Sequence, residues 1–224
     1  MRILVDDKLL EFSDDNLAWM YIDQGDEAEV YQYRDEALKI YKPGSCDKLR
    51  LSEEEAKKLM GIDTNRLLLP RKLIRDADSG EFIGYTTPFI TKATTTGIIR
   101  MKMINFIDEM DIIQNDIMTL TNNYVEVADF GVDNTIYNGK IYLVDPGSYR
   151  IRTVPSLMRF VRSNNSFSLN TYVKNELFAM AKLTKKEKTI LDDVFSDYDS
   201  ISDVMKETAI ENESVRQYVK RMTR

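Results

Sequence analysis

Short stretches of alternating hydrophobic and polar residues fill the first ninety positions, and this two-residue period predicts β-strands. Polar turns separate the stretches. Residues Asp76 to Gly80 form the turn between the strands expected at 67–74 and 81–90, and we expect these two strands to pair in an antiparallel way. The strands are expected at 2–5, 9–12, 18–22, 29–33, 36–41, 67–74 and 81–90. The N-terminal part is therefore predicted to be a sheet of five to seven strands.

One helix is expected inside this sheet. Ser52 and Glu55 have the spacing of a capping box, in which each residue satisfies a backbone N–H of the first turn. The run of glutamates from Glu53 to Glu55 suits the positive end of the helix dipole, and Gly61 is a plausible end.

The period changes after Ile90. Residues 91–97 form a polar connector, and apolar residues then recur at helical spacing from Met103 to Thr121. Asn138 and Gly139 lie between two short apolar segments, which is the strongest hairpin signal of the chain. Further helices are expected at about 168–182, 185–196, 200–208 and 211–222. The order of strands followed by helices, with one inserted hairpin, indicates an α+β fold.

Composition narrows the class of protein. With 224 residues, 43% of them hydrophobic and 30% charged, the chain is expected to fold as a globular protein. The net charge of −6 argues against nucleic-acid binding. A single cysteine, Cys46, excludes an internal disulfide framework and fits a reducing cytoplasm. No apolar run reaches the roughly 18 residues of a membrane span, and Asp6 and Asp7 interrupt any signal-peptide core.

Histidine is absent from the chain. This excludes serine or cysteine nucleophiles activated by histidine, and also histidine-ligated metals. Carboxylates, lysines and oxygen-ligated hard cations such as Mg²⁺ remain available for chemistry.

Three polar residues have a spacing that can hold Mg²⁺ and a phosphate donor. They are Asp129, Asn134 five residues later, and Asp145 after the predicted hairpin. Lys39 lies inside an apolar strand, where an ammonium group needs a partner, and Glu55 on the expected helix is the natural one. An edge-strand lysine that reaches solvent is the alternative interpretation.

A small-residue turn lies between the strands expected at 18–22 and 29–33. Gly25 and Ala28 would let backbone N–H groups approach a phosphate, and Val30 would return into the sheet under an adenine ring. A tight hairpin without a ligand is the simpler interpretation of the same residues.

Together these motifs resemble the eukaryotic-type protein-kinase-like superfamily, which includes aminoglycoside and choline kinases. The resemblance covers about residues 18–150. It implies one two-lobed domain over residues 1–224, with an antiparallel sheet plus one helix as N-lobe (1–90), a connector (91–97) and a mainly helical C-lobe (98–224). It also implies ATP and Mg²⁺ as cofactors.

The resemblance implies a role for each matching residue. Gly25, Ala28 and Val30 match a degenerate glycine-rich loop, and Lys39 matches the strand lysine that holds the α/β-phosphates. Glu55 matches the helix glutamate that orients this lysine, with Glu54 as second choice. Further matches are Thr87, Pro88 and Ile90 near the adenine, Asp129 as the base, and Asn134 and Asp145 as metal ligands.

Departures from the family pattern limit the functional expectation. Ala128 stands where the family usually has arginine, and Gly131 stands where protein Ser/Thr kinases usually have lysine. Pro146 replaces the phenylalanine of D-F-G, and no A-P-E motif follows. The expected function is ATP- and Mg²⁺-dependent phosphotransfer to a hydroxyl, with a protein serine or threonine favoured by family size alone. A small-molecule kinase and a pseudokinase scaffold are the alternatives.

Overall fold

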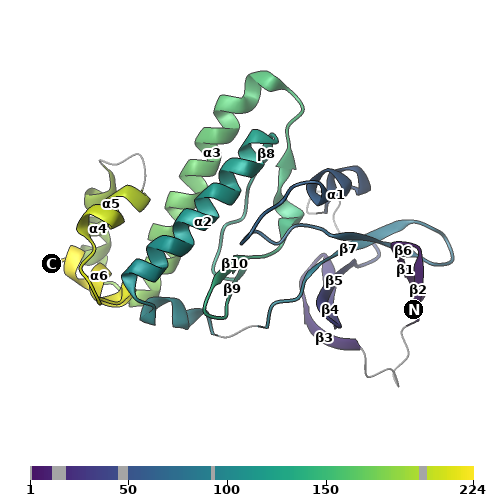
Figure 1. The fold of residues 1–224 in the computed structure, drawn as a ribbon, viewed down its shortest axis with the longest axis horizontal. Coiled ribbons are helices and arrows are strands. Elements are labelled where there is room, and N and C mark those ends of the chain that lie inside the picture. Colours follow the sequence, from purple (N-terminus) through teal and green to yellow (C-terminus); the bar gives the residue numbers. More distant parts are fainter. Residues whose placement is uncertain (1, 12–18, 45–49, 92–93, 197–200) are drawn as a thin grey trace. The chain divides into compact units, whose positions relative to one another are not determined.

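The computed structural model describes residues 2–11, 19–44, 50–91, 94–196 and 201–224. Two compact units are present, and each is treated separately (Figure 1). The sheet unit comprises Met1–Thr64, Leu68–Thr91 and Asp145–Tyr149. The helical unit comprises Asn65–Leu67, Lys92–Val144 and Arg150–Arg224. Cys46 lies outside the described residues.

The sheet unit contains a seven-stranded antiparallel sheet with the strand order β2-β1-β6-β7-β5-β4-β3. Its strands are β1 (Arg2–Val5), β2 (Lys8–Glu11), β3 (Trp19–Gln24), β4 (Ala28–Tyr33), β5 (Glu36–Tyr41), β6 (Lys72–Asp76) and β7 (Phe82–Pro88). The strands expected from alternation are confirmed within a few residues. The exception is the strand expected at 67–74, because β6 begins only at Lys72 and residues 65–67 belong to the helical unit.

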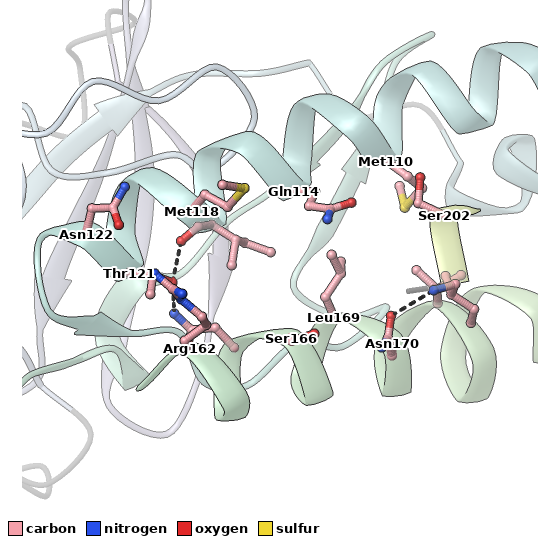
Figure 2. A pocket seen from close by; sticks show the side chains of 14 residues that line it. Met110, Gln114, Met118, Thr121, Asn122, Arg162, Ser166, Leu169, Asn170 and Ser202 are labelled. Carbon is pink, nitrogen blue, oxygen red and sulfur yellow. Dashed lines mark hydrogen bonds between the residues drawn. The ribbon is translucent and has the colours of Figure 1, made fainter. Parts of the chain in front are cut away.

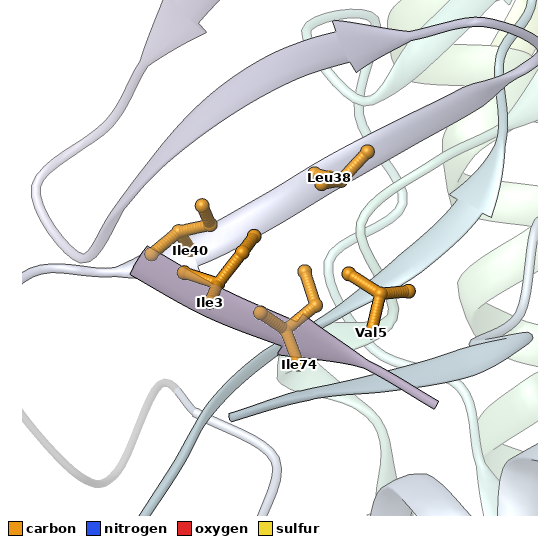
Figure 3. Packing of buried hydrophobic residues seen from close by; sticks show 5 residues of the cluster. All are labelled: Ile3, Val5, Leu38, Ile40 and Ile74. Carbon is orange, nitrogen blue, oxygen red and sulfur yellow. The ribbon is translucent and has the colours of Figure 1, made fainter. Parts of the chain in front are cut away.

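A hydrophobic cluster lies on one face of this sheet. It consists of Ile3 and Val5 of β1, Leu38 and Ile40 of β5, and Ile74 of β6, all buried (Figure 3). Successive side chains of a strand point to opposite faces. Burial of Leu38 and Ile40 therefore turns the side chain between them, that of Lys39, to the other face of β5.

The expected helix is α1 (Glu53–Met60), and its capping box between Ser52 and Glu55 is confirmed. Gly61 is its C-cap residue, and Ala56 and Leu59 are its buried side chains.

The helical unit is built around two long helices, α2 (Met103–Asn122) and α3 (Met158–Thr171), which lie side by side (Figure 1). Three shorter helices follow: α4 (Lys185–Ser196), α5 (Ile201–Thr208) and α6 (Val215–Met222). The short strands are β8 (Val125–Glu126), β9 (Thr135–Tyr137), β10 (Ile141–Leu143) and β11 (Arg150–Ile151), paired as β9 with β10 and β8 with β11. None of the described helices combines the length and apolar character that a membrane crossing requires.

Two expected helix boundaries are wrong. The helix expected at 168–182 starts at Met158 as α3, then continues as a π-helical turn (Tyr172–Leu177) and a 3₁₀ turn (Phe178–Ala181). Serine and asparagine between positions 163 and 170 favour non-helical structure locally. Burial of Val161, Asn165 and Leu169, four residues apart on one face, overrides that preference.

The last helix, α6, begins at Val215 instead of 211. Ser214 and Gln217 form a second capping box there, so the start signal was present in the sequence.

Candidate functional site

Lys39 and Asp145 are 106 positions apart in sequence, and the sheet unit brings them together. The Lys39 ammonium donates a hydrogen bond to Asp145 Oδ1 and another to Glu27 Oε1. The Lys39 side chain is 11% exposed, so this ammonium is mostly removed from water. We call Lys39, Glu27 and Asp145 the Lys39 cluster.

The Lys39 cluster differs from the expectation in one partner. The sequence indicated Glu55 as the carboxylate for Lys39. In the structure Glu55 instead accepts hydrogen bonds from the backbone N–H and the hydroxyl of Ser52, 2.9 Å each. Glu55 is held in this place because it is the third residue of α1, where the capping box requires it.

The segment Gly25 to Val30 forms a tight hairpin between β3 and β4. The Gly25 N–H donates to the Ala28 carbonyl at 3.0 Å, and Val30 pairs with Lys39 across β4 and β5. Gly25 does not have a positive φ, and an added Cβ there would meet nothing within 4 Å. The hairpin interpretation is therefore correct as a description of the backbone, and phosphate binding by this turn remains a prediction.

Asp145 begins a tight turn in a strained conformation. Its φ is +65°, in the left-handed region, and its Oδ1 accepts the N–H of Gly147 at 3.1 Å. Pro146 fixes the next φ, and both Pro146 and Gly147 are buried. A residue other than glycine in the left-handed region of φ and ψ costs free energy, and such residues occur mainly at functional sites.

A buried tyrosine lies on the same face of the sheet. Tyr85 of β7 is the neighbour of Lys39 in β5, and its ring is 1% exposed. Its hydroxyl has no hydrogen-bond partner among the described residues. Burial raises the pKa of this hydroxyl well above its usual value, and the charge of Asp145 adds to the effect. A buried polar atom without a partner needs an explanation such as a bound molecule.

The residues 127–134, which we call the Asp129 loop, carry the other two expected groups. The Asn134 amide nitrogen donates to the Asp129 carboxylate at 2.9 Å and to the Asp129 carbonyl at 3.1 Å. Asp129 is exposed and has a φ of +60°, again in the left-handed region. With its nitrogen facing Asp129, Asn134 has its amide oxygen as the atom that can bind a cation.

The β9–β10 hairpin connects the Asp129 loop to the residue before Asp145. The Val144 N–H donates to the Asn134 carbonyl at 2.9 Å, and Asp145 is the next residue. The expected hairpin is therefore confirmed in type.

Thr87 and Pro88, expected near an adenine, are the last residues of β7 and pair with Ala37 and Glu36 of β5. Ile90 follows outside the strand. Residues 92 and 93 of the expected connector lie outside the described residues. The contact of these three residues with a nucleotide remains a prediction.

Sequence reasoning missed a buried amide that supports the Asp129 loop. Asn165 of α3 is 1% exposed and accepts the Val127 N–H at 2.7 Å. Its amide nitrogen donates to the Thr121 hydroxyl at 2.8 Å and to the Val125 carbonyl at 3.0 Å. Asn165 supports the loop only through contacts with residues distant in sequence. No local signal in the sequence therefore distinguishes Asn165 from the neighbouring Asn164.

Two carboxylates of α2 were also missed. Asp116 accepts the backbone N–H groups of Asn65, Arg66 and Leu67, and Glu109 pairs with the Arg66 guanidinium in a buried bidentate contact. Glu109 also accepts the N–H of Ile141 at 3.0 Å, at the start of β10. Both acids lie among the apolar residues on the buried face of α2. A charged residue at such a position needs a buried partner, and this was the signal in the sequence that could have identified them.

A cavity of about 350 Å³ lies between α2, α3 and the start of α5 (Figure 2). Gln114 and Met118 of α2, Arg162 and Ser166 of α3, and Ser202 of α5 are among its lining residues. Its wall includes Thr121 and Asn165, so it lies behind the residues that support the Asp129 loop.

The oxygen donors of the candidate site suit a hard cation. Carboxylate and amide oxygens are the ligands that Mg²⁺ prefers, and Mg²⁺ is usually held by one or two carboxylates together with phosphates. Among the described residues, no group of three or more acidic, histidine or cysteine side chains could form a complete metal site. Asp145 carries a carboxylate and Asn134 an amide oxygen, so each has a donor of the preferred kind, and their binding of Mg²⁺ remains a prediction.

No family model and no curated protein sequence matches the chain. Among solved structures, the kinase domain of PknI from Mycobacterium tuberculosis is similar, with a TM-score of 0.55 and 12% sequence identity. The match covers 95% of this chain and 98% of that domain. At this identity the likeness shows the fold, so the chain has a protein-kinase-like α+β fold.

Proposed function

We propose that the protein is a phosphotransferase that moves the γ-phosphate of ATP, in the presence of Mg²⁺, to an alcohol group. The observation that carries this proposal is the contact between Lys39 and Asp145, made within a protein-kinase-like fold. The Lys39 ammonium is mostly withdrawn from water, whereas the Asp145 side chain is 36% exposed, and such a pair suits a phosphate and its cation.

The proposal gives each group one task. Lys39 binds the α/β-phosphates, and Asp145 and Asn134 supply oxygen ligands to Mg²⁺. The turn of Gly25 and Ala28 covers the phosphates, while Val30, Thr87, Pro88 and Ile90 lie next to the adenine. Mg²⁺, when bound, neutralises charge on the phosphates, which is the main requirement of phosphoryl transfer.

Asp129 is the proposed base. Its carboxylate takes the proton of the acceptor hydroxyl while the hydroxyl oxygen bonds to the γ-phosphorus. The bond between the γ-phosphorus and the bridging oxygen breaks, and ADP leaves with that electron pair. The Asn134 amide bound to the same carboxylate restricts its rotation, so that it presents one oxygen to the acceptor.

We favour a protein serine or threonine as acceptor, by analogy with the fold. A small-molecule alcohol is the second candidate, and Gly131 favours it. Protein Ser/Thr kinases usually have a lysine at this position, whereas here an added Cβ would meet nothing within 4 Å. The Asp129 loop therefore has open space where a peptide kinase would have a cationic side chain.

A pseudokinase is the third candidate, and the acidity of the turn before β4 favours it. Asp23, Asp26, Glu27 and Glu29 lie in or beside the segment assigned to the phosphates. Four carboxylates oppose the approach of a triphosphate unless a cation accompanies it.

Binding is tested by the melting temperature with and without Mg·ATP. We expect the complex to raise it, and Lys39→Ala and Asp145→Ala to remove most of the rise. Lys57→Ala, which breaks an exposed pair on α1, is the control and retains the rise. A parent protein with no shift at millimolar Mg·ATP contradicts nucleotide binding.

Transfer is tested with ATP labelled at the γ-phosphate, offered with mixed protein acceptors and with a panel of small alcohols. We expect Asp129→Asn to retain the shift in melting temperature and to lose transfer by about 100-fold or more. A parent protein that binds Mg·ATP but transfers no phosphate to any acceptor, with no more labelled product than Asp129→Asn gives, supports the pseudokinase instead.

A further inference from the structure

The Lys39 cluster has a carboxylate that the kinase pattern does not account for. We propose that Glu27, in the turn before β4, is the positioning residue for the Lys39 ammonium, in the role expected of Glu55. This inference rests on the proposed phosphotransfer, which it makes more specific. Glu27 acts through Lys39 and is not assigned a contact with substrate.

The first support is the burial of the pair. The Glu27 side chain is 14% exposed and that of Lys39 is 11% exposed. Withdrawing a carboxylate from water is costly unless a cation and hydrogen bonds compensate. A glutamate at a hairpin tip, with solvent accessible on one side, would stay exposed unless its contact with Lys39 stabilised it.

The second support is the anchoring of the turn that carries Glu27. The Lys42 N–H donates to the Glu27 carbonyl at 2.9 Å, and the Lys42 ammonium donates to the Gly25 carbonyl at 2.8 Å. The next residue, Ala28, is 2% exposed and pairs with Tyr41 of β5. The turn that carries Glu27 is therefore fixed to the end of β5, the strand that carries Lys39, and to Lys42, the residue after it.

The third support is that the glutamates of α1 have other partners. Glu53 pairs with Arg75 and Lys57, and Glu54 pairs with Lys58. Glu55 completes the capping box with Ser52. Releasing Glu55 toward Lys39 would take the Glu55 carboxylate away from the backbone N–H and the hydroxyl of Ser52 and so weaken the capping box of α1.

The two carboxylates of the cluster then have different tasks. Asp145 is the proposed ligand of Mg²⁺, and its Oδ1 also accepts the Gly147 N–H. When Asp145 turns its charge to a cation, Lys39 keeps Glu27 as its protein partner while it binds phosphate. A lysine held from one side presents its remaining N–H groups in a fixed direction.

The pair itself is tested without nucleotide, by a double-mutant cycle in urea. We expect Glu27→Gln to lower the unfolding midpoint of the parent. In a Lys39→Met background we expect the same change to raise it, because Glu27 and Asp145 then repel each other. Glu54→Gln, on the exposed side of α1, is the control and gives equal shifts in both backgrounds. Equal shifts for Glu27→Gln as well would overturn the proposed pair.

The positioning role is tested by kinetics at saturating acceptor. Removal of one charged hydrogen-bond partner predicts a loss of about 10- to 100-fold in kcat/KM for ATP in Glu27→Gln. Glu27→Asp, which keeps the charge on a shorter side chain, should recover part of it. Glu55→Gln, which can still complete the capping box, should remain near the parent.

The outcomes separate the two proposals. Suppose that the double-mutant cycle shows coupling between Glu27 and Lys39, but the parent protein neither binds nor turns over Mg·ATP. This result contradicts the proposed phosphotransferase function and leaves the proposed Glu27–Lys39 pair standing. Turnover that is lost in Glu55→Gln and unchanged in Glu27→Gln overturns the role of Glu27. Turnover that increases in Glu27→Gln overturns it too, because Glu27 would then block the phosphates.

Discussion

The Lys39 cluster and the Asp129 loop are held in place by different kinds of interaction. In the Lys39 cluster the side-chain nitrogen of Lys39 donates hydrogen bonds to the carboxylates of Glu27 and Asp145. The Asp129 loop is supported by the neutral amide of Asn165, whose three hydrogen bonds go to two backbone groups and one hydroxyl. Charged contacts respond to salt and to loss of one partner, whereas buried neutral bonds respond mainly to the removal of an atom.

The largest effect is expected from breaking the neutral network. Asn165→Ala leaves the buried Val127 N–H without its partner and removes the bonds to the Thr121 hydroxyl and the Val125 carbonyl, so we expect the free energy of unfolding to fall by about 3 kcal/mol. The measurement is urea unfolding at pH 7. Asn164→Ala is the control, because the Asn164 side chain donates to the carboxylate of Glu126, which is not fully buried, and its effect should be much smaller. Equal effects of the two substitutions would contradict the supporting role of Asn165.

The charged cluster should break with a smaller loss that depends on salt. Lys39→Met leaves Glu27 and Asp145 without their shared cation, and we expect a loss of about 2 kcal/mol. Because the remaining carboxylates repel each other, the difference from the parent should shrink in 1 M NaCl. Unfolding midpoints at two salt concentrations measure this. A salt-independent difference, like that expected for Asn165→Ala, would remove the contrast between the two regions.

Acid should reduce the stability that Glu126, the residue before the Asp129 loop, contributes. Glu126 is partly buried, which alone would raise the pKa of its carboxyl group, but bonds from Asn164 and Arg152 outweigh this and lower it below the usual 4.5. The contribution of Glu126 is therefore complete well above pH 4.5 and is lost as the pH falls toward its folded pKa. Glu126→Gln should flatten the dependence of stability on pH by about 1 kcal/mol or less. An unchanged slope between pH 6 and pH 3.5 would contradict this.

The smallest effect is expected at Tyr85, with opposite sign. Tyr85→Phe removes a buried hydroxyl that lacks a partner among the described residues, so stability should rise by about 0.5 kcal/mol. The melting temperature without ligand measures this change. A matched substitution, Tyr172→Phe, removes a hydroxyl that bonds to Thr135 and should lower stability. A loss of stability in Tyr85→Phe would mean that its hydroxyl has a partner after all.

Much of the fold could be predicted because local signals coincided with tertiary structure. Alternation placed the strands of the sheet, and the capping residues Ser52 and Glu55 placed α1. The start of α3 could not be predicted, since its serine and asparagine residues disfavour a helix until Val161 and Leu169 are buried.

The candidate site could be predicted only in part. The spacing from Asp129 to Asn134 indicated residues for Mg²⁺ and a phosphate donor, which stays a prediction, and the structure adds a hydrogen bond between the two side chains. The partner of Lys39 was harder to predict, because several carboxylates lie close enough in sequence. The path of the backbone alone decides which of them lies next to the Lys39 ammonium. The sequence indicated Glu55, on the next expected helix, whereas the hairpin before β4 brings Glu27 to Lys39. Their roles in catalysis remain predictions.

The segment from Asn65 to Leu67 limits how the molecule can be divided. It belongs to the helical unit although the residues on both sides belong to the sheet unit. A single cut after Thr91 would separate Arg66 from Glu109 and three backbone donors from Asp116. The larger fragment would then carry two orphaned acids inside α2. We therefore expect neither half to be obtainable as a well-folded piece, and an exchange of halves between distant homologues would have to carry residues 65–67 with the helices.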